Sequence, residues 1–207
     1  MKGGVLAALA QGAALAVLLL GMPFAAHAAT ETYAIDPAHT MPGFEVSHLG
    51  ISTQRGRFER TAGTIALDRE AGTGAVAIEI DAASITTGTA KLDATVRGED
   101  FLDAAHHPRI TFRAERFRFD KDVPVSAEGE LTLLGVAKPV TLAITHFACT
   151  RKPFLVRTTC GADASATISR AAFGMSRFAS FLGDDVRIVI QVEAVKEEPP
   201  APTSSGG

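Results

Sequence analysis

Two polar side chains stand among apolar neighbours, where they could bind the polar group of a ligand. His48 follows Phe44 and Val46 on one face of the alternating stretch FEVSHLGISTQRGRFE, residues 44–59. Imidazole nitrogens can hydrogen-bond a carbonyl or a phosphate oxygen. The alternative for His48 is a core histidine whose ring is satisfied by a backbone carbonyl.

Arg97 is the second candidate, and it lies near Phe101 in an irregular segment. A guanidinium group matches phosphate or carboxylate oxygens in a two-pronged contact. Arg97 could equally form a structural ion pair with Asp100 or Asp103. The residues alone leave both interpretations open.

The sequence carries none of the common catalytic motifs. It has no G-x-S-x-G elbow, no H-E-x-x-H pair and no phosphate-binding glycine loop. The histidines show no metal-ligand spacing, and Asp36 near His39 lacks an identifiable nucleophile to complete a triad. We therefore predict a protein with no catalytic residues, resident metal or cofactor, and an enzyme acting on a lipid remains an alternative.

The first 28 residues have the pattern of an export signal. Lys2 precedes an apolar run from Val5 to Leu20, and the small-x-small tripeptide Ala26-His27-Ala28 follows it. This pattern predicts a signal peptide over residues 1–28, cleaved after Ala28, and a periplasmic protein. The alternative is an uncleaved anchor, although the run is short for a membrane span of about 20 residues.

An exported chain with two cysteines predicts a disulfide, here between Cys149 and Cys160. The bond would staple a hairpin whose loop lies near Lys152 and Pro153. In the chain-entropy model so short a loop stabilises the fold by roughly 2–3 kcal/mol. The alternative is that the two cysteines form a redox-active or metal-binding pair, but they lack the C-x-x-C spacing typical of such pairs.

Composition indicates one globular domain without a nucleic-acid partner. The chain has 20 Lys and Arg against 23 Asp and Glu, and these charges form no basic stripe. The length after the signal suits one domain over residues 29–195. Residues 196–207 are polar and rich in Pro, Ser and Gly, which predicts a disordered tail.

Apolar and polar residues alternate along most of this domain, which predicts antiparallel strands. AVAIEID (75–81) and DVRIVIQVEA (185–194) are clear examples. In RITFRAERFRF (109–119) the apolar parity shifts after Ala114, which predicts a bulge near Glu115. About eight such strands predict an all-β fold, an antiparallel barrel that closes on itself. A two-sheet sandwich is the alternative.

The segment around residues 88–104 breaks this alternation. Leu92 and Val96 are four residues apart, as on one face of a helix. We expect a short helical segment that crosses one end of the sheet.

Six stretches in order along the domain resemble the YceI-like family of exported, lipocalin-like barrels. They are YAIDPAHT (33–40), GFEVSHLGISTQRGRF (43–58), LDREAGT (67–73), VRGEDFLDAAHHPRITF (96–112), GELTLLGVAKPVTL (129–142), and AAFGM followed by GDDVRIVIQVEA. The resemblance implies a barrel whose lumen binds a polyisoprenoid or other long-chain amphiphile, such as an isoprenoid quinone or a prenyl phosphate. It also implies a periplasmic carrier rather than an enzyme. The lipocalin Gly-x-Trp signature is absent, because the chain has no Trp.

A lipid-binding lumen needs an apolar lining with a few polar groups. On alternation alone the same side chains would equally fill a solid core, as in an accessory or stress-response β-domain without a ligand, and the resemblance favours a cavity. The expected partner is a polyisoprenoid or quinone-like lipid, with a membrane cytochrome, a lipid-pathway enzyme or a second copy as further candidates. The predicted ligand-binding residues are Phe44, Val46, His48, Phe58, Ile65, Ile78, Arg97, Phe101, Phe112, Leu133 and Ile188.

Overall fold

The computed structural model describes residues 30–151 and 157–198 of the 207-residue chain. The predicted signal peptide and the hairpin loop predicted near Lys152 and Pro153 lie outside the described residues, as do residues 199–207 of the predicted tail. Lys196, which the sequence pattern assigned to the tail, is the last residue of strand β11 (Leu182–Lys196).

The alternating stretches form strands, because period-two alternation places apolar side chains on one face of a pleated backbone. All the pairings between the described strands are antiparallel. The other strands are β1 (Glu31–Ile35), β2 (Gly43–His48), β3 (Ser52–Phe58), β4 (Thr61–Asp68), β5 (Thr73–Asp81), β6 (Ile85–Thr86), β7 (Arg109–Asp120), β8 (Val123–Leu133), β9 (Val136–Thr150) and β10 (Thr159–Ser169).

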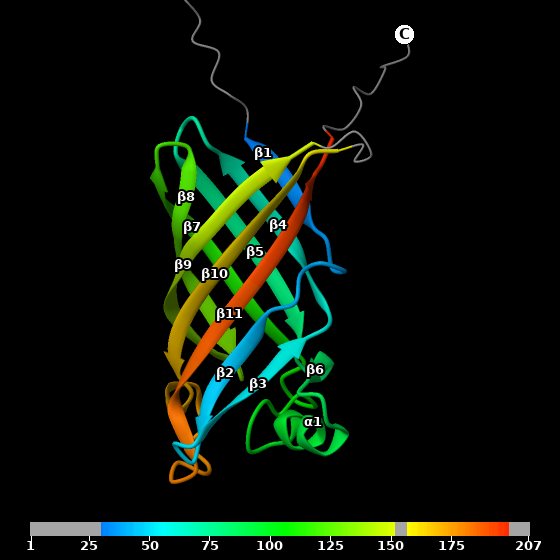
Figure 1. Ribbon diagram of the computed structural model, residues 1–207, viewed down its shortest axis with the longest axis vertical. Coiled ribbons are helices and arrows are strands. Elements are labelled where there is room, and N and C mark those ends of the chain that lie inside the picture. The colour runs from blue at the N-terminus through cyan, green and yellow to red at the C-terminus, as the bar shows by residue number, and fades with distance from the viewer. Residues whose placement is uncertain (1–29, 152–156, 199–207) are drawn as a thin grey trace, which may run out of the picture.

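The sheet closes into a barrel (Figure 1). Hydrogen bonding runs in the order β1-β4-β5-β7-β8-β9-β10-β11, and β11 pairs again with β1. Strands β2 and β3 continue the wall, since β11 pairs with β1 around Ala194 and with β2 around Ile188. The predicted all-β antiparallel barrel of about eight strands is confirmed, and the sandwich alternative is wrong because the pairing ring is complete.

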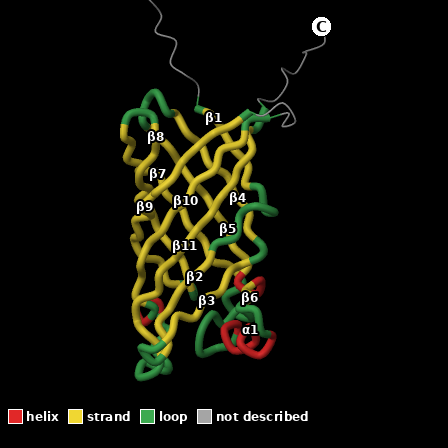
Figure 2. The backbone as a smooth tube through the Cα atoms, in the orientation of Figure 1, coloured by secondary structure: helices red, strands yellow, loops and turns green. Residues whose placement is uncertain are grey.

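Two local predictions are also confirmed. The pairing of β7 with β8 shifts register between Ala114 and Arg116, which is the bulge expected near Glu115. Helix α1 (Ala90–Arg97) lies within the predicted helical segment. Figure 2 shows strands along the length of the barrel and helical segments at one end of it. Among the described residues no helix is long and apolar enough to cross a membrane.

Strand β1 lies toward the end of the barrel opposite α1, here called the closed end (Figure 1). A small buried cluster is built there from residues of β1, β10 and β11. Tyr33, Ile35 and Ala194 are buried there beside Cys160. Cys160 is bonded to Cys149, its register partner on β9, so the predicted disulfide is present and joins β9 to β10. The disulfide therefore crosslinks the end of β9 to the start of β10.

A polar network covers this cluster. The Tyr33 hydroxyl donates a hydrogen bond to the Glu31 carboxylate at 2.5 Å, and the Lys196 ammonium group donates to the same carboxylate. Hydrogen bonds from Lys196 and Tyr33 hold the pKa of Glu31 below its usual value. Burial, followed by the hydrogen bond to Glu31, raises the pKa of Tyr33 to about 12.

We predict that the native protein shows no tyrosinate absorbance near pH 10 and that the Tyr33 side chain is half ionised at about pH 12. Tyr33 is the only tyrosine and the chain has no tryptophan, so an ultraviolet pH titration reports this one side chain. Because the pKa of Tyr33 is raised in the folded state, the protonated Tyr33 side chain contributes to stability below pH 10. This contribution is lost as the pH rises toward 12. In the control, protein unfolded in guanidinium chloride, Tyr33 should titrate near pH 10. If Tyr33 of the native protein also titrates near pH 10, its burial is contradicted.

Candidate functional site

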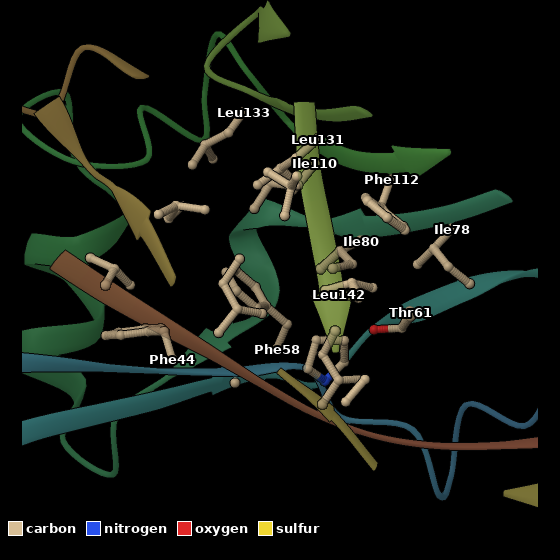
Figure 3. A pocket seen from close by; sticks show the side chains of 18 of the residues that line it. Phe44, Phe58, Thr61, Ile78, Ile80, Ile110, Phe112, Leu131, Leu133 and Leu142 are labelled. Carbon is tan, nitrogen blue, oxygen red and sulfur yellow. The ribbon is translucent and has the colours of Figure 1, made fainter. Parts of the chain in front are cut away.

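The barrel encloses a cavity of about 750 Å³. This volume lies in the range of small-molecule binding sites, about 300–1,000 Å³. The interior is thus a lumen and not the solid core that alternation alone allowed. Side chains from opposite walls line it, as Figure 3 shows for Phe44, Phe58, Ile78, Ile80, Ile110, Phe112, Leu131, Leu133 and Leu142.

The structure brings ten of the eleven predicted ligand-binding residues together around this cavity. They come from β2, β3, β4, β5, β7, β8 and β11 and from the segment after α1, because each strand turns alternate residues inward. Their contact with a ligand stays a prediction. The ten are Phe44, Val46, His48, Phe58, Ile65, Ile78, Phe101, Phe112, Leu133 and Ile188.

Arg97, the eleventh, does not line the cavity. Its Nε atom donates to the backbone oxygen of Asp93 at 3.1 Å, and its guanidinium lies 3.8 Å from the Asp93 carboxylate. The ion pairs considered for Arg97 from the sequence are wrong, since Asp100 pairs with Arg177 and Asp103 with His106. The physical reason is that α1 runs as far as Arg97, which places Asp93 one helical turn away.

His48 lies at the end of β2, opposite Leu182 of β11, and lines the cavity. The hydrogen bonds found among the described residues include none to its ring. The alternative of a histidine satisfied by a backbone carbonyl therefore finds no support in the described part of the chain. Its nitrogens can accept or donate a hydrogen bond in the lumen.

The cavity opens at the end of the barrel where α1 lies, here called the mouth. Phe178 and Phe181 line the cavity and are also 44% and 55% exposed, so the apolar lining continues to the outside. Phe101 stacks on Phe178 with 5.9 Å between ring centroids. This contact joins the segment after α1 to the loop between β10 and β11.

Arg170 is a lumen residue that the sequence analysis missed. It lies just after β10, lines the cavity and is only 4% exposed. Burial of a charge is costly unless hydrogen bonds compensate it, and this guanidinium donates to four backbone carbonyls. They are the carbonyls of Met175, Arg177 (2.8 Å), Leu182 (3.3 Å) and Gly183 (3.0 Å).

Arg170 thereby organises the loop that carries Phe178 and Phe181. Among the described residues no carboxylate lies within ion-pair distance of it, although its charge contributes to the lowered pKa of Asp184 after hydrogen bonds from Ser169 and Ala171. The only signal in the sequence is an arginine between Ile168 and the apolar stretch AAFGM, and this does not distinguish a buried arginine from a solvated one.

Thr61 contributes a second polar group to the lumen that sequence reasoning did not identify. Its hydroxyl is buried without a hydrogen-bond partner among the described residues, and Figure 3 shows its oxygen pointing in among apolar side chains. A buried hydroxyl without a partner costs roughly 1–3 kcal/mol. A ligand oxygen or a water molecule at this position would remove that cost.

The structure also assembles a cluster of possible metal ligands on the outer surface. Asp36, His39 and Glu193 have ligand atoms within 4.8 Å of one another. The hydrogen bond between His39 and Asp36, at 2.7 Å, raises the pKa of His39 and lowers that of Asp36. The sequence pattern showed only Asp36 and His39, because Glu193 follows more than 150 residues later.

Comparisons with known proteins agree with this architecture. The model of the family described as YceI-like domain matches residues 33–194. The UPF0312 protein of Vibrio vulnificus strain YJ016 is 33% identical over 138 residues, which cover 66% of this chain and 73% of that protein.

Two solved structures are similar in fold. Burkholderia cenocepacia BcnA has a TM-score of 0.66 and 23% identity, over 77% of this chain and 99% of that chain. A polyisoprenoid binding domain from Saccharophagus degradans, implicated in plant cell wall breakdown, has a TM-score of 0.58 and 16% identity, over 80% of this chain and 98% of that chain.

Proposed function

The chain belongs to the YceI-like family, and we propose that it binds a polyisoprenoid or other long-chain amphiphile in its barrel, without catalysing a reaction. The observation that carries this proposal is the lumen of about 750 Å³, which is lined almost entirely by apolar side chains. Burial of each CH₂ group of a ligand there stabilises the complex by about 0.8 kcal/mol. The similar Saccharophagus degradans domain is itself described as polyisoprenoid binding, which supports the same ligand class.

The polar group of the ligand is proposed to lie near the mouth, with the apolar tail inside. His48 and Arg170 both line the lumen beside Leu182, since His48 is its register partner and Arg170 donates to its carbonyl. The positive charge of Arg170 favours an anionic or carbonyl group, such as that of a prenyl phosphate or a quinone. Toward the closed end the lumen is lined by apolar residues such as Ile144, Ile190 and Val192, which suit a hydrocarbon chain.

We place this binding in the periplasm and assign the protein a carrier role. The pairing of Cys149 with Cys160 supports an oxidising compartment. A carrier that shields a long tail delivers it to a membrane acceptor, for which a membrane cytochrome or a lipid-pathway enzyme is the proposed partner, with a homodimer as the proposed assembly.

Mass spectrometry of an organic extract tests the ligand class. We expect protein purified without detergent from its own host to release a polyprenyl or quinone species close to one molecule per chain. Extracts of heat-denatured protein and of buffer alone serve as controls. Fatty acids at variable occupancy would indicate a lumen without selectivity, and extracts that repeatedly contain no long-chain species would contradict the proposal.

A further inference from the structure

Four exposed apolar side chains gather at the mouth. Leu49, Ile51, Phe178 and Phe181 are 49%, 80%, 44% and 55% exposed, and we call these four residues the mouth patch. They are four of the six large hydrophobic residues that are exposed among the described residues. Single exposed apolar residues are ordinary, whereas a contiguous group of them marks an interaction site.

Two turns hold the mouth patch together. The backbone N–H of Leu49 donates to the carbonyl of Phe181 at 2.7 Å, which ties the β2–β3 turn to the loop before β11. Phe181 in turn donates to the carbonyl of Phe178 at 2.9 Å, and Ile51 donates to that of His48 at 3.1 Å. The patch is therefore a defined surface built from segments that lie about 130 residues apart in the chain.

The backbone at the mouth patch favours other residue types. Leu49 and Phe178 have φ angles of 55° and 60°, a left-handed conformation that suits glycine or asparagine and is uncommon for bulky residues. Leu49 and Phe178 adopt this unfavourable conformation while 49% and 44% of their surfaces stay exposed, although the Phe178 ring also stacks on Phe101. The contacts within the folded monomer leave this exposed apolar surface unexplained, and its burial against a partner would explain it.

We propose that the mouth patch inserts into the surface of a phospholipid bilayer while the lumen exchanges its amphiphile, an inference that rests on the proposed function. Phe178 and Phe181 belong to the patch and also line the lumen. An apolar chain can therefore pass from the bilayer into the barrel without crossing water. Side chains at the tips of two turns match the shallow insertion of about 5–10 Å into the boundary between headgroups and acyl chains.

The size of the mouth patch favours a bilayer over a protein partner. Its exposed surface is on the order of 450 Å², if a fully exposed large apolar side chain presents about 200 Å². A stable protein–protein interface buries about 800 Å² on each partner. Insertion into a bilayer needs no complementary surface and works with this smaller area.

Charge adds little to the proposed docking. The guanidinium of Arg177 lies 5.6 Å from the centre of the Phe178 ring but is paired with Asp100 at 3.3 Å. The formal net charge of the chain is −3, which does not attract anionic lipids. Docking therefore depends on apolar insertion, and it changes little with salt or with the fraction of anionic lipid.

Flotation of the purified chain with phosphatidylcholine vesicles tests this inference. The double substitution of Leu49→Asn and Ile51→Gln should reduce partition roughly tenfold or more, because both side chains lose their burial in lipid. Asparagine fits the left-handed position, so the melting temperature should stay equal or rise. Val123→Gln, at the β7–β8 turn near the closed end, is the matched control and should partition as the unchanged chain does.

Binding of farnesol, followed in parallel, separates this inference from the proposed function. Neither Leu49 nor Ile51 lines the lumen, so the double variant should bind farnesol as tightly as the unchanged chain. If the unchanged chain partitions to vesicles more than the double variant but does not bind farnesol, docking is supported and the proposed function is contradicted. Equal partition of variant and unchanged chain would overturn docking. Partition that requires anionic vesicles and disappears in salt would also overturn docking. A third contradicting result is a dimer of the unchanged chain, seen in sedimentation, that the double substitution abolishes while neither protein binds vesicles.

Discussion

Replacement of Arg170 by alanine is expected to lower the free energy of unfolding by about 3–5 kcal/mol, in the range of a broken buried charge network. The guanidinium donates four hydrogen bonds to carbonyls of the loop before β11. Each buried carbonyl left without a donor costs roughly 1–3 kcal/mol, and the carbonyls nearest the surface recover part of that cost from water. For a domain of this size the melting temperature should fall by about 8–15 °C.

Differential scanning calorimetry or chemical unfolding measures this effect. Arg170→Lys should recover only a small part of the loss, because an ammonium group cannot serve four separated carbonyls as the planar guanidinium does. Arg116→Ala is the control, since Arg116 is exposed on the barrel wall and its pair with Glu128 is worth less than about 1 kcal/mol. A loss below 1 kcal/mol for Arg170→Ala would show that the carbonyls do not depend on this side chain.

The second large effect is expected from Ala164→Phe, which places a ring inside the lumen. Ala164 lines the cavity between Ile144 on β9 and Ile190 on β11, its register partners. A ring that displaces two to four CH₂ groups of a bound chain removes about 1.6–3 kcal/mol of binding free energy. Affinity for a long-chain prenyl compound should therefore fall by roughly ten- to a hundredfold.

Stability distinguishes this result from damage to the fold. In a filled core the added ring would cost about 1–3 kcal/mol, whereas an open lumen accommodates it with little change in melting temperature. Thr167→Phe is the matched control on the same strand, because Thr167 is exposed on the outer surface and should leave affinity unchanged. Unchanged affinity of Ala164→Phe would show that the ligand does not occupy this part of the barrel.

Arg170 and the mouth patch connect stability with ligand exchange. The carbonyls that accept from Arg170 include that of Arg177, which directly precedes Phe178, and that of Leu182, which directly follows Phe181. One buried cation thus positions both aromatic residues at the mouth. In terms of sequence this couples the end of β10 to the start of β11.

Most of the lumen could be predicted from the sequence because strand geometry is local. Successive side chains alternate between the two faces of a strand, so the side on which Ile78 or Phe112 lies follows from its neighbours whatever strand pairs beside it. The same locality explains the bulge near Glu115 and the short helix over Ala90–Arg97. The disulfide was predictable because the chain has only Cys149 and Cys160.

Only the tertiary structure decided whether those apolar faces enclose a cavity, since that depends on how many strands form the ring that closes where β11 pairs with β1. It also decided that Arg170 is buried and that Arg97 turns toward Asp93 instead of the lumen. The mouth patch and the cluster of Asp36, His39 and Glu193 join segments more than 100 residues apart. Alternation and spacing report the few residues around each position, whereas these features arise from barrel closure, which brings distant residues into contact.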